Sequence, residues 1–137
     1  MISILILGLT MITSASTSEL TVRFEKLRNT EGTVKYLIFS GPEGFPDTPE
    51  KAIKQGVFEA IKVQEGLRLE LAPGHYAISI IHDENNNDKL DTNFMGIPKE
   101  GFGFSNNPRI FFGPPSFEKA SFEFSQSKEI SIEMKYF

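Results

Sequence analysis

Oxygen-bearing side chains recur at every second position in one short stretch of the chain. Asp83, Asn85 and Asn87 have this spacing, and Lys89 and Asp91 continue it. A curling backbone can direct several such oxygens at one point, which is what a hard cation such as Ca²⁺ requires. With Asp83 at the first position of a calcium loop, Asn85 and Asn87 fall at the third and fifth. Lys89 then contributes its backbone carbonyl at the seventh position and Asp91 falls at the ninth, so the spacing predicts a candidate calcium site.

Two positions depart from the calcium-loop pattern. Asp88 stands at the sixth position, where Gly is usual, although Asp tolerates the left-handed backbone. Phe94 stands at the twelfth, where a bidentate carboxylate is usual, so a complete site would need a remote oxygen from Asn93 or Glu100. The alternative is an Asp/Asn-rich loop whose side chains hydrogen-bond their own backbone, and both interpretations stay open.

The candidate calcium loop directly follows a histidine. His82 as a general base beside the acidic loop would suit a metal-assisted hydrolase, whereas the competing interpretation is a partly buried histidine at a strand end. His75 lies on a Pro-Gly turn, and we expect it to be solvated. The chain has only two histidines, so it cannot supply a three-His zinc site by itself.

A long stretch rich in Gly, Pro and Phe follows, over residues 92–117. Loops of this length are often functional. Apolar rings beside hydrogen-bonding groups suit a carbohydrate or peptide ligand. The candidate ligand-binding residues are Glu100, Phe102, Phe104, Ser105, Asn106 and Asn107. The alternative, which the cost of exposed Phe clusters favours, is that the rings of Phe94, Phe102, Phe104, Phe111 and Phe112 turn inward as a small satellite core.

Length and composition indicate one globular domain. The chain has 137 residues, of which 39% are hydrophobic and 23% charged, enough for one core and too few for two. Its net charge of −4, without a basic stripe, argues against a nucleic-acid partner. The absence of cysteine excludes disulfides, thiol catalysis and a lipid-anchored cysteine.

The N-terminus predicts export. Residues 1–16 carry no charge, and an apolar block too short to span a bilayer precedes small Thr, Ser and Ala residues that suit a signal-peptidase site. A basic residue before the block is missing. We predict removal of residues 1–16, no membrane-spanning segment after cleavage, and a single domain over residues 17–137 in the periplasm or medium.

Alternating apolar residues predict a succession of short strands. Strands are expected at residues 20–24, 33–39, 57–63, 67–71, 76–82, 120–124 and 130–136, the first two forming a hairpin. Thr48 and Pro49 predict one or two helical turns over residues 49–55, ended by Gly56. The Ala-Pro-Gly turn at 72–74, followed by Tyr76, is typical of a sandwich corner in which Gly74 supplies φ freedom. The fold class is therefore all-β: an antiparallel β-sandwich of about seven strands with at most one short helix.

Two linked motifs resemble those of a known family. Residues 77–93 carry His-Asp-x-Asn-x-Asn-x-x-Leu-Asp, and residues 96–107 carry Gly-Ile-Pro, then Glu-Gly-Phe-Gly-Phe-Ser-Asn-Asn. Together with Pro115-Ser116-Phe117 they resemble a bacterial exported family of unknown function, over essentially the whole mature chain. That family usually has Gly where Asp88 stands. The resemblance implies a β-sandwich similar to prealbumin-like and carboxypeptidase-regulatory-like domains, and no established activity.

Three functions remain open from the sequence. The first is a non-catalytic binding or accessory module with a calcium-stabilised Asp/Asn loop, whose ligand would be a carbohydrate or peptide. The second is a metal-assisted hydrolase that uses His82 and the acidic loop, and the third is a purely structural envelope protein. The absence of a convergent base and nucleophile in the sequence favours the first and third.

Overall fold

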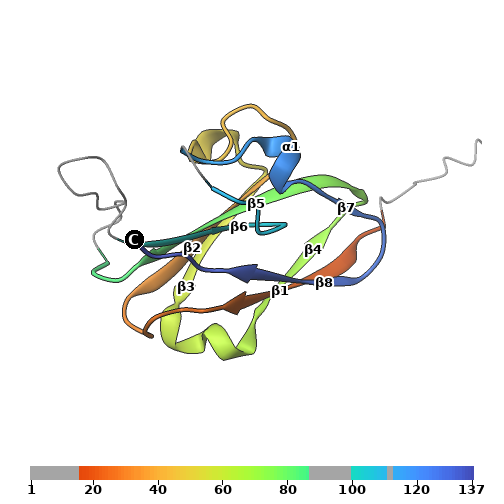
Figure 1. Ribbon diagram of the computed structural model, residues 1–137. Coiled ribbons are helices and arrows are strands. Elements are labelled where there is room, and N and C mark those ends of the chain that lie inside the picture. The colour runs from red at the N-terminus through yellow and green to blue at the C-terminus, as the bar shows by residue number, and fades with distance from the viewer. Residues whose placement is uncertain (1–15, 87–99, 111–112) are drawn as a thin grey trace, which may run out of the picture.

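The described part of the chain folds into eight strands with little helix. The computed structural model describes residues 16–86, 100–110 and 113–137 (Figure 1). The strands are β1 (Ser18–Glu25), β2 (Thr33–Phe39), β3 (Lys54–Glu59), β4 (Leu67–Leu71), β5 (Gly74–Asp83), β6 (Gly101–Phe104), β7 (Phe122–Phe124) and β8 (Lys128–Glu133). One α-helix, α1 (Phe117–Ala120), and two 3-10 helices, η1 (Pro49–Lys51) and η2 (Ala60–Glu65), join them. The predicted all-β fold class is confirmed.

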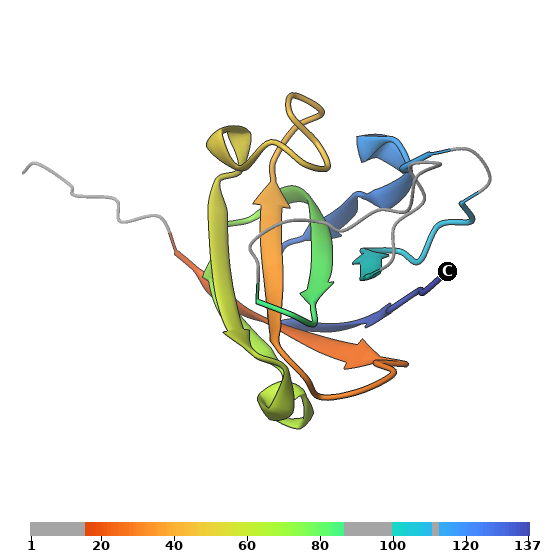
Figure 2. The same ribbon diagram turned by 90° about the vertical axis from the view of Figure 1, so that its left-hand side faces the viewer.

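The strands form two sheets that face each other as a sandwich (Figures 1 and 2). The smaller sheet has the order β4-β1-β8 and the larger β3-β2-β5-β6, with β7 also paired to β5. Every strand pair is antiparallel except β1 with β8, which is parallel. On one side the sheets are joined by a bridge between Phe102 of β6 and Lys135.

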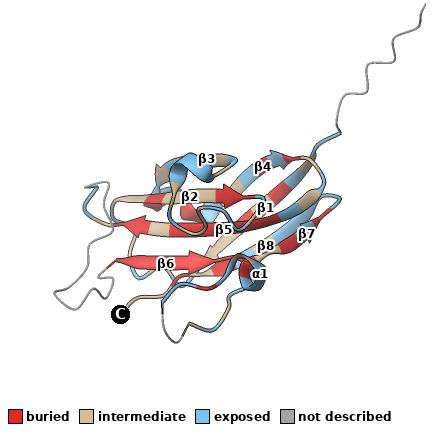
Figure 3. Ribbon diagram, turned by 90° about the horizontal axis from the view of Figure 1, so that it is seen from above, coloured by how far each residue is buried: buried red, intermediate tan, exposed pale blue. Residues whose placement is uncertain are grey.

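The main core lies between the sheets and follows the alternation of each strand. Buried side chains from both sheets meet there, among them Leu20 and Val22 of β1, Ile78 and Ile80 of β5, and Ile132 of β8. Figure 3 shows buried stretches on strands of both sheets. A second, smaller cluster covers part of the outer face of the larger sheet. It consists of Ala77, Phe102, Phe104 and Ala120, with Phe45, Ile110 and Phe117 packed against them.

Strand β5 is the centre of the larger sheet. It pairs with β2 from Ala77 to Asp83 on one side, and with β7 and then β6 on the other. Apolar side chains on both of its faces explain its near-continuous burial, because one face meets the main core and the other the smaller cluster. Its last residues, His82 and Asp83, are therefore held on both sides at the point where the chain enters the Asp/Asn loop.

The predicted hairpin of the first two strands is wrong. β1 pairs with β4 and β8 in the smaller sheet, whereas β2 pairs with β3 and β5 in the larger one. Residues 26–32 therefore cross from one sheet to the other, and Leu27 packs against the core on the way. Polar turn residues between two strands are compatible with either connection, so their composition alone does not distinguish a hairpin from a crossover.

The predicted helix at residues 49–55 is shorter than expected. Only η1 forms, Thr48 makes no side-chain capping bond, and β3 already begins at Lys54. Gly56 lies inside β3 opposite Tyr36, whose ring occupies the space that a side chain at position 56 would need. The predicted strand over 57–63 accordingly starts earlier and ends at Glu59, where η2 begins.

The C-terminal third also differs from the predicted elements. The stretch expected to be loop contains β6, whose two glycines lie over Ile132, Met134 and Tyr136 where side chains would collide. The strand predicted over 120–124 begins at Phe122, after α1, and the last strand covers Lys128–Glu133. We predicted at most one short helix. The α-helix of the described residues is α1, whereas the helix expected near Pro49 is reduced to the 3-10 turn η1.

The corner before β5 forms around Tyr76, as predicted. The Tyr76 hydroxyl donates a hydrogen bond of 2.5 Å to the Ala72 carbonyl, four residues back. The predicted role of Gly74 needs correction, because Gly74 is not among the residues with positive φ. Its lack of a side chain instead leaves room for the Tyr76 ring, which would lie 3.3 Å from a Cβ at that position.

Tyr76→Phe tests this corner. We expect a loss of about 1 kcal/mol in the free energy of unfolding, because the Ala72 carbonyl loses its donor while the buried ring remains. Urea denaturation measures the loss. Tyr36→Phe is the control, because the Tyr36 hydroxyl has no bond to a described residue like the one that Tyr76 makes to the Ala72 carbonyl. Equal stability of wild type and Tyr76→Phe would contradict the interpretation.

Candidate functional site

A buried histidine lies at the end of β5, directly before the Asp/Asn loop. The His82 side chain is fully buried, and both ring nitrogens have partners. Nδ1 lies 2.8 Å from the Tyr136 hydroxyl, and Nε2 lies 2.6 Å from the backbone carbonyl of Glu31. The imidazole thus joins β5 to the C-terminal segment and to the turn that follows β1.

The partners determine which nitrogen carries the proton. A carbonyl oxygen can only accept, so Nε2 must donate to Glu31. Nδ1 of the neutral ring then accepts from the Tyr136 hydroxyl. Burial raises the pKa of the Tyr136 phenol, which keeps its proton available for this bond at neutral pH. A histidine with both nitrogens used in this way is not in a position to take a proton from a substrate.

A charged pair covers the tyrosine. The Arg28 guanidinium lies over the Tyr136 ring, with Cζ 4.5 Å from the ring centroid. The same guanidinium binds Glu84, with Nε and Nη2 at 2.9 and 2.5 Å from Oε1. Asn29 donates to the other carboxylate oxygen at 3.0 Å. We call His82, Tyr136, Arg28, Asn29 and Glu84 the His82 cluster.

The electrostatics of Glu84 follow from these contacts. Its side chain is 16% exposed. Burial alone would raise the pKa of the carboxyl, but hydrogen bonds from Asn29 and Arg28 and the charge of Arg28 outweigh it. The pKa of Glu84 therefore lies below its usual value, and the carboxylate is ionised at neutral pH.

Two glycines permit the close packing of the His82 cluster. Gly32 has a φ of 70° and lies against the backbone of Asp83 and Glu84, where a side chain would overlap the Asp83 carbonyl. Gly101 of β6 is paired with His82, and the Tyr136 ring occupies the place of its missing side chain. Larger residues at either position would separate the strands that hold the histidine.

The structure describes part of the predicted calcium site. Asp83 is 1% exposed, with its Oδ2 3.4 Å from Lys35 Nζ on the neighbouring strand β2. Asn85 is exposed, and Asn86 has a left-handed backbone with a φ of 55°. Asn87, Lys89 and Asp91 lie outside the described residues, as do Asp88 and Phe94. The predicted site therefore remains a prediction.

A second carboxylate lies at the same end of the sheet. Gly101 pairs with His82, so Glu100 precedes β6 where Asp83 ends β5. Glu100 is 4% exposed. Asp83 and Glu100 are therefore two buried acidic residues at the same end of the larger sheet. The sequence offered two residues that could supply a remote oxygen, Asn93 and Glu100. Asn93 lies outside the described residues, and Glu100 lies beside the end of β5.

The two predicted ligand-binding phenylalanines face inward. Phe102 and Phe104 are less than a tenth exposed and belong to the smaller cluster on the outer face of the larger sheet. Phe45 contacts Phe104 at a centroid distance of 6.1 Å, and Phe137 lies 5.5 Å from Phe102. This is the inward arrangement considered as the alternative to ligand binding; Phe94, Phe111 and Phe112 lie outside the described residues.

The three polar residues after Phe104 connect different elements. Ser105 is fully buried; its hydroxyl accepts from the Ile78 N–H and donates to the Ala120 carbonyl. Asn106 and Asn107 both have positive φ, which Asn tolerates. The Asn106 amide donates to the carbonyls of Lys119 and Ser121, at the end of α1. Asn107 donates to Ser131 and accepts from the Glu133 N–H, both on β8.

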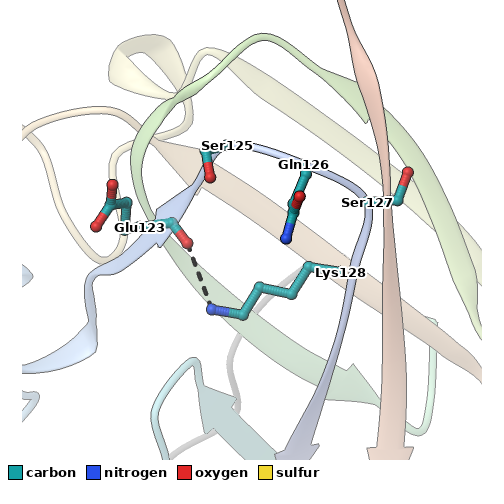
Figure 4. A pocket seen from close by; sticks show the side chains of 5 residues that line it. All are labelled: Glu123, Ser125, Gln126, Ser127 and Lys128. Carbon is teal, nitrogen blue, oxygen red and sulfur yellow. Dashed lines mark hydrogen bonds between the residues drawn. The ribbon is translucent and has the colours of Figure 1, made fainter.

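Two hollows of the described surface lie away from the His82 cluster. The hollow in Figure 4 lies at the turn between β7 and β8 and is lined by the exposed side chains of Glu123, Ser125, Gln126, Ser127 and Lys128. Lys128 reaches back to the Glu123 carbonyl at 3.4 Å. Within residues 16–86, 100–110 and 113–137, no three His, Asp or Glu side chains are grouped to hold a metal ion. The described part of the chain also has no helix long and apolar enough to cross a membrane.

Sequence reasoning singled out His82 but none of its partners. Arg28, Asn29 and Tyr136 are each more than fifty residues away from His82 in the sequence, and the turn at Arg28 carries no chemical motif. The available signal was indirect: Arg28 and Asn29 stand in a turn that also contains Gly32, and Tyr136 alternates with apolar residues in the last strand.

Glu84→Gln tests the electrostatics of the His82 cluster. A depressed pKa in the folded state stabilises the protein above the unfolded-state pKa of Glu, about 4.3, and this contribution is lost as pH falls through the folded pKa. We expect the variant to be less stable by about 1–2 kcal/mol at pH 7 and the difference to shrink below about pH 4.

Urea denaturation at a series of pH values measures this difference. Glu65→Gln is the control, because Glu65 is exposed and its substitution is expected to change stability by less than about 0.5 kcal/mol. A gap between wild type and Glu84→Gln that stays constant from pH 3 to pH 7 would contradict the interpretation.

Comparison with known proteins gives one match. Neither the curated proteins nor the solved structures contain a match to the chain. A family model described as an uncharacterized protein conserved in bacteria, DUF2141, matches residues 22–133, which run from β1 to the end of β8. The match includes the His82 cluster except Tyr136, together with the Asp/Asn loop and the Ser-Asn-Asn turn. The chain therefore belongs to the DUF2141 family of uncharacterized bacterial proteins.

Proposed function

We propose that this protein is a non-catalytic binding or accessory module. The observation that carries the proposal is the environment of His82. The hydrolase interpretation needs this imidazole as a base that a substrate or a metal-bound water can reach. The side chain is fully buried and both nitrogens are used, by Tyr136 and by the Glu31 carbonyl. His82 therefore acts as a structural connector.

In this proposal the ligand meets the end of the sandwich at which the chain leaves β5 and enters β6. Two buried carboxylates, Asp83 and Glu100, flank the segment between them. The His82 cluster fixes the end of β5, and the start of β6 is paired to it through Gly101. The Ser-Asn-Asn turn anchors the opposite end of β6 against α1 and β8. A rigid base of this kind is what a loop needs to present one surface to a carbohydrate or peptide.

We further propose that Ca²⁺ binds the loop and stabilises it. The position of Glu100 supports this, because it adds a carboxylate to the incomplete set that begins with Asp83. The left-handed backbone at Asn86 supports it too, since the chain starts to curl directly after β5. Without the cation, the Lys35 ammonium balances the charge of Asp83.

We place the module outside the cytoplasm. The uncharged apolar N-terminus followed by small residues supports removal of residues 1–16 by a signal peptidase. The fold is consistent with this, because β1 begins at Ser18, two residues beyond the proposed cleavage point.

Thermal melting with Ca²⁺ and with a chelator tests the calcium proposal. We expect Ca²⁺ at about 100 times its dissociation constant to add about 2.7 kcal/mol to the free energy of unfolding. Asp91→Ala should abolish this increment, because it removes a predicted ligand. Asp47→Ala, which changes an exposed aspartate in another loop, should retain it.

A further pair of variants distinguishes the effect of calcium binding from that of the Asp83–Lys35 ion pair. Asp83→Ala removes both a predicted ligand and the partner of Lys35, whereas Lys35→Gln removes only the ion pair. We expect the calcium increment to be lost in the first and kept in the second. An unchanged midpoint in wild type, or an equal shift in Asp91→Ala, would contradict calcium binding.

Activity and binding screens test the non-catalytic assignment. We expect no turnover of ester, peptide and glycoside substrates, and retention by a glycan or peptide array. Glu100→Gln should weaken retention, because Glu100 lies directly before β6, at the end of the sandwich where this proposal places the ligand. Turnover that disappears in a folded His82→Gln variant would contradict the proposal and favour the hydrolase.

A further inference from the structure

The edge strand β3 has an exposed apolar pattern that is symmetric about its centre. Four large hydrophobic side chains are exposed in the described part of the chain, and three of them are Ile53, Val57 and Ile61, at 50%, 59% and 68%. Val57 is in the middle of β3, Ile53 immediately precedes the strand, and Ile61 is in η2. The two isoleucines thus stand four residues on either side of Val57.

The outer backbone edge of β3 is unpaired within the described residues. β3 is the last strand of its sheet and pairs only with β2 (Figure 2). The opposite side of the sandwich is joined through Phe102 and Lys135, so the β3 side is the open one. An exposed sheet edge with apolar side chains is a template for pairing with another strand.

The hydrogen-bond pattern shows which residues of β3 face outward. The Ala60 N–H donates to the Gly32 carbonyl at 3.0 Å, and Gly32 stands opposite Ala60 in the register of the two strands. In an antiparallel pair, bonded and non-bonded positions alternate. The backbone groups of Gln55, Val57 and Glu59 therefore point away from β2, and these three residues are exposed.

We propose that two copies of this chain associate through β3, by antiparallel pairing about a two-fold axis at Val57. Such an axis, perpendicular to the sheet, preserves the inner and outer faces and joins two larger sheets into one. It places Val57 opposite Val57 of the second copy and Gln55 opposite Glu59. These are the residues whose backbone groups point outward, so each finds a partner.

The side chains are complementary in the same register. Ile53 and Ile61 of the second copy lie just beyond the same end of the paired segment, on both sides of the axis, so the exposed apolar residues are grouped along one interface. Gln55 can donate to the Glu59 carboxylate, and no like charges stand directly opposite each other. A second copy fits this edge better than an unrelated peptide, because the apolar spacing of the edge matches itself.

Sedimentation velocity over a range of concentrations, on the full chain, tests the dimer. Wild type should show a concentration-dependent monomer–dimer equilibrium. Gln55→Lys creates two cross-strand Lys–Glu pairs and should tighten the dimer roughly 2–30-fold, whereas Gln55→Glu places like charges opposite and should weaken it by a similar factor. Both changes are at an exposed position, so folding is not affected. Phe137→Ser, remote from β3, should leave the equilibrium unchanged.

Cysteine cross-linking tests the register, because the chain has no cysteine of its own. Cα atoms of a bonded antiparallel pair are about 5.5 Å apart, within the range that a disulfide bridges. Val57→Cys should form covalent dimers rapidly, and a mixture of Ile53→Cys with Ile61→Cys should form mixed dimers. Gln126→Cys, on the exposed β7–β8 turn, should not. A monomer at all concentrations, or equal cross-linking of Val57→Cys and Gln126→Cys, would overturn the proposal.

Discussion

The structure depends on one buried imidazole that holds three distant parts of the chain together. His82 ends the central strand, accepts from the hydroxyl of Tyr136 in the last residues and donates to the Glu31 carbonyl in the turn after β1. Leaving a buried ring nitrogen without a hydrogen-bond partner would cost about 1–3 kcal/mol. The Tyr136 segment and the turn at Glu31 must therefore both stay in contact with His82. Arg28 then lies over the tyrosine ring, and Glu84 holds the Arg28 guanidinium in place.

The Ser-Asn-Asn turn anchors the opposite end of β6. Its side chains satisfy backbone groups of β5, α1 and β8, so the residues after the strand are held as firmly as the strand itself. The start of β6 is held at the other end of the sheet, where Gly101 pairs with His82. The His82 cluster and the Ser-Asn-Asn turn thus fix β5 and β6 at opposite ends, and in the proposed function this rigidity supports the loop between the two strands.

The fold class could be predicted from the sequence, because apolar and polar residues alternate in a strand according to which of its faces is buried. The strands near residues 20, 35, 70 and 78 are present, and the Tyr76 corner formed as expected. Pairing was not predictable in the same way: the turn at 28–32 looked like a hairpin and is a crossover, because local composition does not say which sheet the next strand joins. Gly56 and the glycines of β6 looked like breaks, but each makes room for a ring or side chain from elsewhere in the sequence. For the same reason His82 was found and Arg28, Asn29 and Tyr136 were missed.

The protonation state of His82 tests the central claim most directly. Long-range ¹H–¹⁵N correlation spectra of the imidazole distinguish the two neutral tautomers and the cation. The account predicts a single tautomer at neutral pH, with the proton on Nε2, slow exchange with solvent, and a changed Nδ1 signal in Tyr136→Phe. A mixture of tautomers that exchange rapidly with water would contradict a buried structural histidine and restore His82 as a candidate base.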